Sequence, residues 1–440
     1  MIGEILVCSM FLCLIIGLVT GHPLAFVLGG VGALAGYIGW GTSIFSVLTI
    51  RVYDAMSTYS TVAIPMFVLM AAFLTKSKVA DGLFDSIRYL FGPVKGGLGI
   101  AVIAVATVFA ATTGIIGASV VTMGMLGLPV LLKHGYKEEL AVGCVMSGGT
   151  LGILIPPSIM LVLMGTYANV SVGKLFLAAL LPGLTLSAGY MLYTFIACQI
   201  HPDWGPAMSA EELAEMPMSQ RIKGSLVNLV PPLILIVGVL GSIFGGIATP
   251  TEAAGVGAFV AMVMCIFYGK FNFQVLKESL LETVKTSAMC FAIVFGANTF
   301  TSVFMALDGD EMIANFVHSL GLSGWGVFAA MMILVFILGM FIDWLGIIML
   351  TFSIFLPILD SFGFDRLYVV ATTAVLLQTS FLTPPFGYAL FYIKSLVPPT
   401  ITMKTIYKSV IPFVLIMIIV VLITIFWPGM VLLLPSMSSL

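Results

Sequence analysis

Charged residues are scarce in this chain. Asp, Glu, Lys and Arg make up only 8% of its 440 residues, whereas 60% are hydrophobic. Soluble globular domains carry about 25% charged residues, so a soluble fold is excluded. The long apolar runs instead predict an all-α polytopic membrane protein. A formal net charge of −2 argues against nucleic acid as a partner.

Residue types that hold metals or cofactors are also few. The four histidines lie far apart, and the six cysteines are scattered through apolar runs. Neither pattern indicates a metal cluster or a disulfide framework. The Walker-type motif GxxxxGK[ST] is absent from the sequence, so ATP binding is not predicted. We therefore expect no cofactor and no enzyme activity. No basic region precedes the first apolar run, so residues 4–20 are expected to form a membrane helix and not a cleaved signal.

A Pro-Pro pair interrupts a long apolar stretch twice. The first copy, SGGTLGILIPPS, covers residues 147–158, and the second, LQTSFLTPPF, covers residues 377–386. Each proline lacks an amide donor and clashes with the carbonyl one turn back, so each pair should break its helix. One such pair more often forms a simple helix kink, but two pairs at matching places favour a binding site. The carbonyls and amides freed at such a break suit a cation and an anion.

These breaks belong to an internal duplication. The matching positions keep an offset of 227–230 residues: Pro23 with Pro250, Pro156-Pro157 with Pro384-Pro385, and Lys174 with Lys404. Duplicated halves are usual in secondary transporters. The expected organisation is repeat 1 over residues 1–198, a polar cytoplasmic linker over 199–227 and repeat 2 over 228–440.

Each repeat is expected to contain one re-entrant hairpin and one interrupted helix. The hairpins cover residues 98–132 and 324–357, because apolar runs this short do not comfortably cross a hydrocarbon core of about 30 Å. The interrupted helices cover residues 138–166 and 366–394. Five crossings per repeat is an odd number, so the second repeat enters the membrane upside down. The fold expected is two inverted-topology repeats with about ten transmembrane helices, two hairpins and two interrupted helices.

The basic residues support this topology. All but three of the 17 Lys and Arg residues fall on one side of it, and the exceptions are Arg51, Lys174 and Arg366. Because cytoplasmic loops are rich in Lys and Arg, the side that holds most of these residues should be cytoplasmic. Both termini are then outside, with one hairpin opening inward and the other outward.

The hairpin tips hold the candidate ion ligands. The first tip offers Thr112, Thr113, Gly114 and Ser119, whose hydroxyl and carbonyl oxygens suit a hard cation such as sodium. The alternative is that these hydroxyls only satisfy backbone carbonyls between close helices. The second tip holds Asp343, and a carboxylate deep in the bilayer costs roughly 2.5–3.5 kcal/mol on insertion scales. It should therefore face a cavity or a cation, unless the tip simply reaches interfacial water.

Two further patterns have structural interpretations. Thr249, Pro250 and Glu252 fit a capping box at the start of a helix. Residues 76–97 are amphipathic, and one helical face of this segment is apolar, formed by Val79, Leu83, Phe84 and Ile87.

Several longer motifs together resemble one family across nearly the whole chain. They are GPVKGGLGIAVI, AATTGIIGASVVTMG, SGGTLGILIPPSI, GGIATPTEAAGVGA and LQTSFLTPPFGYALFY. The chain resembles the large membrane subunit of tripartite ATP-independent periplasmic (TRAP) transporters. The resemblance implies an ion-transporter-superfamily fold in the bacterial inner membrane. It also implies sodium-coupled uptake of organic acids by an elevator motion. The partners it implies are a periplasmic substrate-binding protein (P-type), a small membrane subunit (Q-type) and the lipid bilayer.

The resemblance also implies where the ligands bind. Sodium sites would lie where each hairpin tip meets a broken helix. The first falls on Thr112, Thr113 and Gly114 with Gly149 and Thr150, and the second on Asp343 with Thr379, Ser380 and Thr383. The substrate carboxylate would lie at the helix breaks, which comprise Gly149, Thr150, Pro156, Pro157, Ser158, Thr383, Pro384 and Pro385.

Other functions stay open at this point. One is a stand-alone sodium- or proton-coupled carboxylate transporter of the same superfamily, although Asp343 is the one acid expected deep in the core. A membrane enzyme acting on lipids would need clustered acids or a histidine beside a nucleophile, and the scattered histidines disfavour it. A passive channel is disfavoured because repeated broken helices suit alternating access.

Overall fold

The computed structural model describes residues 2–114, 116–319, 321–384 and 387–438. No strand occurs in this part of the chain. The helices of the first half are α1 (Ile2–Val19), α2 (Leu24–Trp40), α3 (Ile44–Ser57), α4 (Ala63–Lys76), α5 (Val79–Phe91), α6 (Gly97–Thr113), α7 (Ile116–Lys133), α8 (Glu138–Thr150), α9 (Ile159–Tyr167) and α10 (Val172–Ile200).

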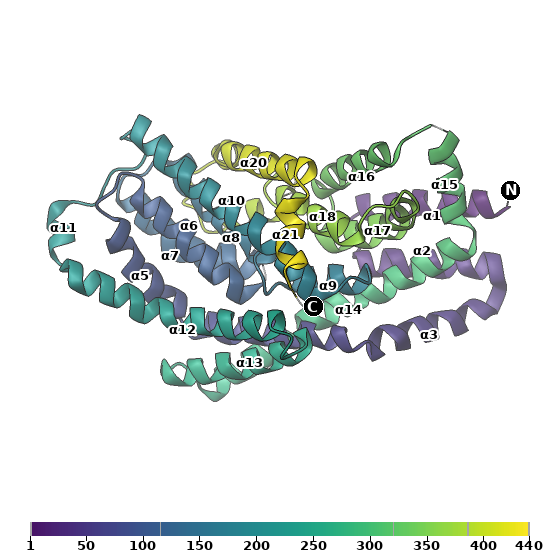
Figure 1. Ribbon diagram of the computed structural model, residues 1–440, viewed down its shortest axis with the longest axis horizontal. Coiled ribbons are helices and arrows are strands. Elements are labelled where there is room, and N and C mark those ends of the chain that lie inside the picture. Colours follow the sequence, from purple (N-terminus) through teal and green to yellow (C-terminus); the bar gives the residue numbers. More distant parts are fainter. Residues whose placement is uncertain (1, 115, 320, 385–386, 439–440) are drawn as a thin grey trace.

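The rest of the chain is built in the same way. Its helices are α11 (Ala210–Ala214), α12 (Met218–Phe244), α13 (Pro250–Phe267), α14 (Phe273–Ala306), α15 (Gly309–Ser319), α16 (Gly324–Gly339), α17 (Trp344–Ser361), α18 (Arg366–Ser380), α19 (Tyr388–Lys394), α20 (Met403–Phe426) and α21 (Gly429–Ser436). In Figure 1, α6, α7 and α8 gather on one side and α16, α17 and α18 on the other. Helices α12 and α13 run along the lower edge.

The expected fold class, an all-α polytopic membrane protein, is confirmed. Eight helices in the described part are long and apolar enough to cross a membrane, and the bent pair α4 and α5 would make a ninth. This count by length includes α7 and α17, which pack back against α6 and α16 as hairpins. It omits the two interrupted helices, because each of their halves is short.

The main packing contacts between the two halves are reciprocal. Helix α2 packs along α14, and their counterparts in the other half, α13 and α4, pack along each other. Likewise α8 packs against α20 while α18 packs against α10. An exchange of equivalent partners is what a two-fold axis between two repeats produces. The exact repeat boundaries remain predictions.

One arm differs between the halves. In the first half, α3 and α4 are separated by a short 3₁₀ turn (Tyr59–Val62), whereas the matching stretch of the second half is the single 34-residue helix α14. Pro65 lies in the first turn of α4, where its missing amide needs no helical partner. Ile293 stands at the matching position of α14, so the longer helix can continue.

The amphipathic segment packs through its apolar face, as expected. Val79, Leu83, Phe84 and Ile87 of α5 are all buried, and α5 packs on α12. Both ends of the polar linker predicted over 199–227 lie in helices, because α10 extends to Ile200 and α12 already begins at Met218. The linker itself stays a prediction.

The early start of α12 has a local cause. Arg221 in its first turn donates hydrogen bonds back to the carbonyls of Met216 and Leu213. The polar start of the helix is thereby tied to the chain that precedes it.

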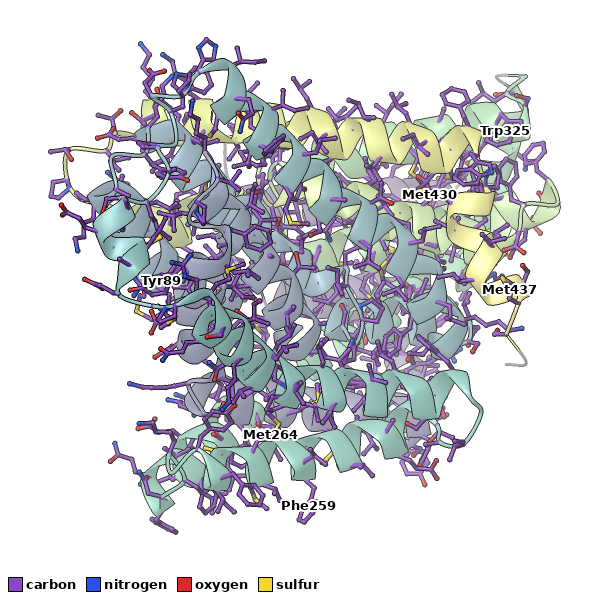
Figure 2. All side chains as sticks on the ribbon, turned by 60° about the vertical axis from the view of Figure 1, so that its left-hand side comes forward. Tyr89, Phe259, Met264, Trp325, Met430 and Met437 are labelled. Carbon is purple, nitrogen blue, oxygen red and sulfur yellow. The ribbon has the colours of Figure 1, made fainter. Side chains whose placement is uncertain are left out.

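The outer face of α13 is apolar and exposed. Figure 2 shows Phe259 of α13 pointing away from the molecule, as expected for a helix with one face towards lipid.

The packing of α2 on α14 depends on small residues. A β-carbon at Gly32 would lie 2.9 Å from Cα and N of Phe300, whereas one at Gly30 would meet nothing within 4 Å. Glycine therefore allows the two backbones to approach closely, as in other membrane helix pairs.

We predict that Gly32→Ala lowers the stability of the purified protein, by about 1–3 kcal/mol, the usual range for overpacking. Thermal unfolding in detergent should show a lower melting temperature. Gly30→Ala, two positions away on the same helix, is the matched control and should unfold at or above the wild-type temperature. Equal melting temperatures for the two variants would contradict the predicted backbone contact.

Candidate functional site

A cavity of ≈ 680 Å³ lies between the two hairpin tips and the arms. The first tip contributes Gly114, Ile116 and Gly117, and the second contributes residues 341–345. The broken helices contribute Ile153, Ile159, Phe381, Tyr388 and Tyr392. The arms contribute residues 21–26, before and at the start of α2, and Thr286, Met289, Cys290, Ala292 and Ile293 of α14.

The first tip touches the second half of the first broken helix. Gly114 ends α6 in a left-handed conformation (φ 60°), which favours glycine. A β-carbon there would lie 3.5 Å from the Pro157 carbonyl oxygen and 3.4 Å from the Ile159 amide nitrogen. The tip and the break are thus in direct contact.

The end of α8, where the first break begins, packs on α7, the second helix of the first hairpin. A β-carbon at Gly149 would lie 2.8 Å from Cα of Val120 on α7, so α8 and α7 meet backbone to backbone. The next residue, Thr150, is fully buried, and its hydroxyl donates to the Ser147 carbonyl at 2.9 Å. Ser119 is also fully buried, on α7. These residues lie behind the cavity wall and do not line the cavity.

The first break closes on itself through Ser158. Pro156 and Pro157, joined by a cis peptide bond, are buried in the gap between the helices. The Ser158 hydroxyl donates to the Ile153 carbonyl and accepts the Leu161 amide at 3.4 Å, which caps α9. The hydroxyl of Ser158 is therefore already engaged in holding the two sides of the gap together.

Asp343 lies at the second tip and faces the cavity. It is the N-cap of α17, and its carboxylate accepts the Leu345 amide at 3.4 Å. It is the one carboxylate among the described lining residues, and these include no Lys or Arg. His22 is the one basic side chain of the described lining.

The hydroxyl groups at the second break differ in whether they have a hydrogen-bond partner. Thr379 donates to the Leu376 carbonyl at 2.7 Å, and Thr383 donates to the Thr379 carbonyl at 2.5 Å. The Ser380 hydroxyl is 3% exposed and has no hydrogen-bond partner among the described residues. A buried hydroxyl without a partner indicates a place for a water or an ion.

Ser380 also touches the second hairpin. A β-carbon at Gly339, the last residue of α16, would lie 1.9 Å from the Ser380 Oγ. Of the residues that the resemblance groups at this tip, Ser380 is the one in this contact, and the grouping of Asp343, Thr379, Ser380 and Thr383 as a site stays a prediction. Asp343 lines the cavity, whereas Thr379 and Ser380 are buried behind it.

Some predicted residues fall partly or wholly outside this description. Thr112 and Thr113 are the last residues of α6, and their side chains are not among those described. Pro384 lies within the second break, between α18 and α19, and Pro385 lies outside the described residues. Their roles as ligands stay predictions.

The capping box lies away from the cavity. The Thr249 amide donates to the Glu252 carboxylate at 2.8 Å, and the Glu252 amide donates to the Thr249 hydroxyl at 3.3 Å. Pro250 is the first residue of α13. None of the three lines the cavity, so their observed role is to begin the helix.

A cluster of three hydroxyls was missed from the sequence. The Tyr167 hydroxyl lies 2.6 Å from Ser353 Oγ and 3.0 Å from Thr301 Oγ1, and the last two lie 2.8 Å apart. The cluster joins α9 and α17, which carry the break and the hairpin, to the arm α14. The three residues are distant in sequence and sit in ordinary apolar helices, so no local pattern indicates their meeting.

Comparison with known proteins gives a consistent result. Residues 7–430 match the family model described as "Tripartite ATP-independent periplasmic transporter, DctM component". The C4-dicarboxylate TRAP transporter large permease protein DctM of Pseudomonas aeruginosa is 33% identical over 390 residues, which cover 88% of this chain and 89% of that protein. The isethionate TRAP transporter permease protein DctMQ of Oleidesulfovibrio alaskensis is 28% identical over 413 residues, which cover 94% of this chain and 64% of that longer protein.

A solved structure shows the same fold at low sequence identity. The Alcanivorax borkumensis YdaH transporter matches with a TM-score of 0.65 and 14% identity, over 92% of this chain and 98% of that one. At this identity the likeness concerns the fold alone.

The contact between Gly339 and Ser380 makes a testable prediction. Gly339→Ala should push the second tip away from the broken helix, because the added carbon would overlap the serine hydroxyl. Hydrogen exchange at the end of α16 and the end of α18 should become roughly fivefold faster or more, as a loss of 1–3 kcal/mol implies. Gly326→Ala, on the same helix with no neighbour closer than 3.4 Å, is the control. Unchanged exchange in Gly339→Ala would show that the contact does not hold the tip in place.

Proposed function

The chain belongs to the DctM component family of tripartite ATP-independent periplasmic (TRAP) transporters, and we propose that it is the permease subunit through which a sodium gradient drives a small organic acid inward. The relatives are named as transporter permeases, which agrees with the expectation of a transporter and not an enzyme. The two substrates that their names give, a C4-dicarboxylate and isethionate, are both organic anions.

The charge of the cavity is the observation that carries this proposal. An organic acid entering a site that already holds the Asp343 carboxylate is repelled strongly in a low-dielectric surrounding. No Lys or Arg among the described lining residues offsets this charge. A bound cation would remove the repulsion, so binding of the acid and of the cation would be coupled. Oxygen ligands suit sodium.

The oxygens for two sodium ions are proposed at the two tips. At the second tip they would come from Asp343 and from the hydroxyls of Thr379, Ser380 and Thr383, of which Ser380 has no other partner among the described residues. At the first tip they would come from the end of α6, with Thr112, Thr113 and Gly114, and from Gly149 and Thr150. The substrate would lie in the cavity between these ions, near the helix breaks.

The moving unit is proposed to be the hairpins with the broken helices. Each hairpin touches a break through glycine, at Gly149 and at Gly339, so hairpin and broken helix would move as one body. The reciprocal pairs α2 with α14 and α4 with α13 would form the frame in the bacterial inner membrane. An elevator motion of the first body against this frame would expose the cavity to each side in turn.

A binding protein and a small membrane subunit are proposed as separate partners. The strongest test is uptake into proteoliposomes that contain this chain together with the small subunit. A labelled C4-dicarboxylate and labelled isethionate would each be offered with or without a sodium gradient and with or without the periplasmic binding protein. We predict uptake only when both the gradient and the binding protein are present. Uptake without the binding protein would instead favour a stand-alone transporter of the same superfamily.

Asp343 gives a second prediction from the same preparation. Asp343→Asn keeps the shape of the side chain but removes the charge that would hold a cation. The sodium concentration for half-maximal uptake should rise about tenfold or more, because a charged ligand contributes roughly 1.4 kcal/mol or more. Asp54→Asn on the exposed face of α3 is the control and should behave as wild type. An unchanged sodium dependence in Asp343→Asn would remove Asp343 from the proposed site.

A further inference from the structure

A second hollow, of ≈ 420 Å³, lies far from the tips on the lysine-rich side of the molecule. It is formed where α8 begins, where α10 ends and where α20 begins. Its polar lining is Lys137, Glu139, Ser409 and Lys408, and Tyr193 and Trp204 add aromatic rings. Its apolar lining is Leu140, Ile411, Pro412, Phe413 and Leu415. We propose that this hollow binds a phospholipid with an anionic phosphodiester headgroup.

The charges of the hollow match such a headgroup. Two lysines and one glutamate line it, which leaves one net positive charge for one phosphodiester. Lys137 lies 3.9 Å from Glu139, with its ammonium 4.0 Å from the centre of the Trp204 ring. Lys408 is exposed and forms no ion pair within the described residues. Basic pockets between membrane helices on the cytoplasmic side are known places for anionic lipid headgroups.

The surroundings of Lys408 match the rest of the lipid. Ile411 and Leu415 are 56% and 54% exposed and lie one turn apart on α20, so they form an apolar strip that begins at the lysine. An acyl chain can pack on this strip, whereas a small soluble anion has no apolar part that would contact it. Pro412 has no amide to donate to the Lys408 carbonyl one turn earlier, which leaves that carbonyl without its usual helical partner. A headgroup hydroxyl could donate to it.

The aromatic residues place the hollow at the membrane surface. Trp204 stacks on His201, and its carbonyl accepts the Lys137 amide at 2.9 Å. Tyr193 packs edge-on against Phe413, with ring centres 5.2 Å apart. Trp and Tyr concentrate at the level of lipid headgroups, where one end of the ring is apolar and the other wet.

The duplicated fold does not itself require these lysines. At the matching positions of the other repeat, Lys137 is replaced by Asp365 and Lys408 by Ala178, although Pro412 is matched by Pro182. Asp365 caps α18 by accepting the Tyr368 amide at 2.8 Å. Lys137 occupies the same cap position on α8 and makes no such bond. A cation at the start of a helix is electrostatically unfavourable, so Lys137 serves something other than the helix.

The test uses the purified full-length chain, stripped of lipid in detergent, with phosphatidylglycerol and phosphatidylethanolamine added in turn. Native mass spectrometry reports the affinity for each lipid. The wild type should prefer phosphatidylglycerol. Lys408→Gln should weaken that binding about fivefold, and Lys137→Gln with Lys408→Gln about 25-fold, as roughly 1 kcal/mol per lysine implies. Lys408→Arg should retain the binding.

The control is Lys404→Gln, which removes a lysine one turn earlier on α20 that does not line the hollow. It should bind phosphatidylglycerol as the wild type does, and Lys404→Gln and Lys408→Gln should both unfold at the wild-type temperature without lipid. Equal binding by wild type and the double variant, or equal loss in Lys404→Gln, would overturn the proposal. Displacement of the lipid by chain-free glycerophosphoglycerol at similar concentration would also overturn it, because the site would then hold a soluble anion.

Discussion

The fold depends on one constraint, that no backbone amide or carbonyl can be left unpaired in hydrocarbon. Both interrupted helices violate the regular pattern at membrane depth, and both repair it locally. Ser158 bridges the first gap, and Thr383 returns two donors to the Thr379 carbonyl at the second. Beyond the second gap, the Ala389 amide donates to the Phe381 carbonyl at 3.2 Å. A hairpin helix packs on each broken helix, α7 on α8 and α16 on α18.

That packing works only because glycine is present at the contacts. Gly149 meets the backbone of α7 near Val120, and Gly339 meets Ser380. Any larger side chain at either position would lift a hairpin away from a break and open the gap to lipid or water. The same glycines therefore hold hairpin and broken helix in close contact, as the proposed elevator motion would require.

Much of this arrangement follows from local sequence. The Pro-Pro pairs mark the breaks, the near-constant offsets mark the duplication, and the spacing of Val79, Leu83, Phe84 and Ile87 marks a buried face, because each is a short-range or periodic signal. The meeting of Tyr167 with Thr301 and Ser353 could not be predicted, since it depends on the final packing of three distant helices. The continuity of α14 could not be predicted either, although the sequence has Ile293 where the first repeat has Pro65.

The two repeats share a backbone plan but not its chemistry, and this asymmetry matters for a core that moves between its arms as proposed. On one face, α9 and α17 hydrogen-bond to Thr301 of α14. The positions matching Thr301 and Ser353 in the other repeat are Phe73 and Met125. Phe73 is buried and packs on Phe271, which also belongs to the arms, whereas Met125 is 59% exposed. Separation on the first face must break directional bonds worth about 0.5–1.5 kcal/mol each, whereas the matching positions of the other repeat have no hydroxyl to form such bonds. The two orientations of such a core are therefore unequal in energy even before any ligand binds, and the hydroxyl cluster favours the orientation seen here.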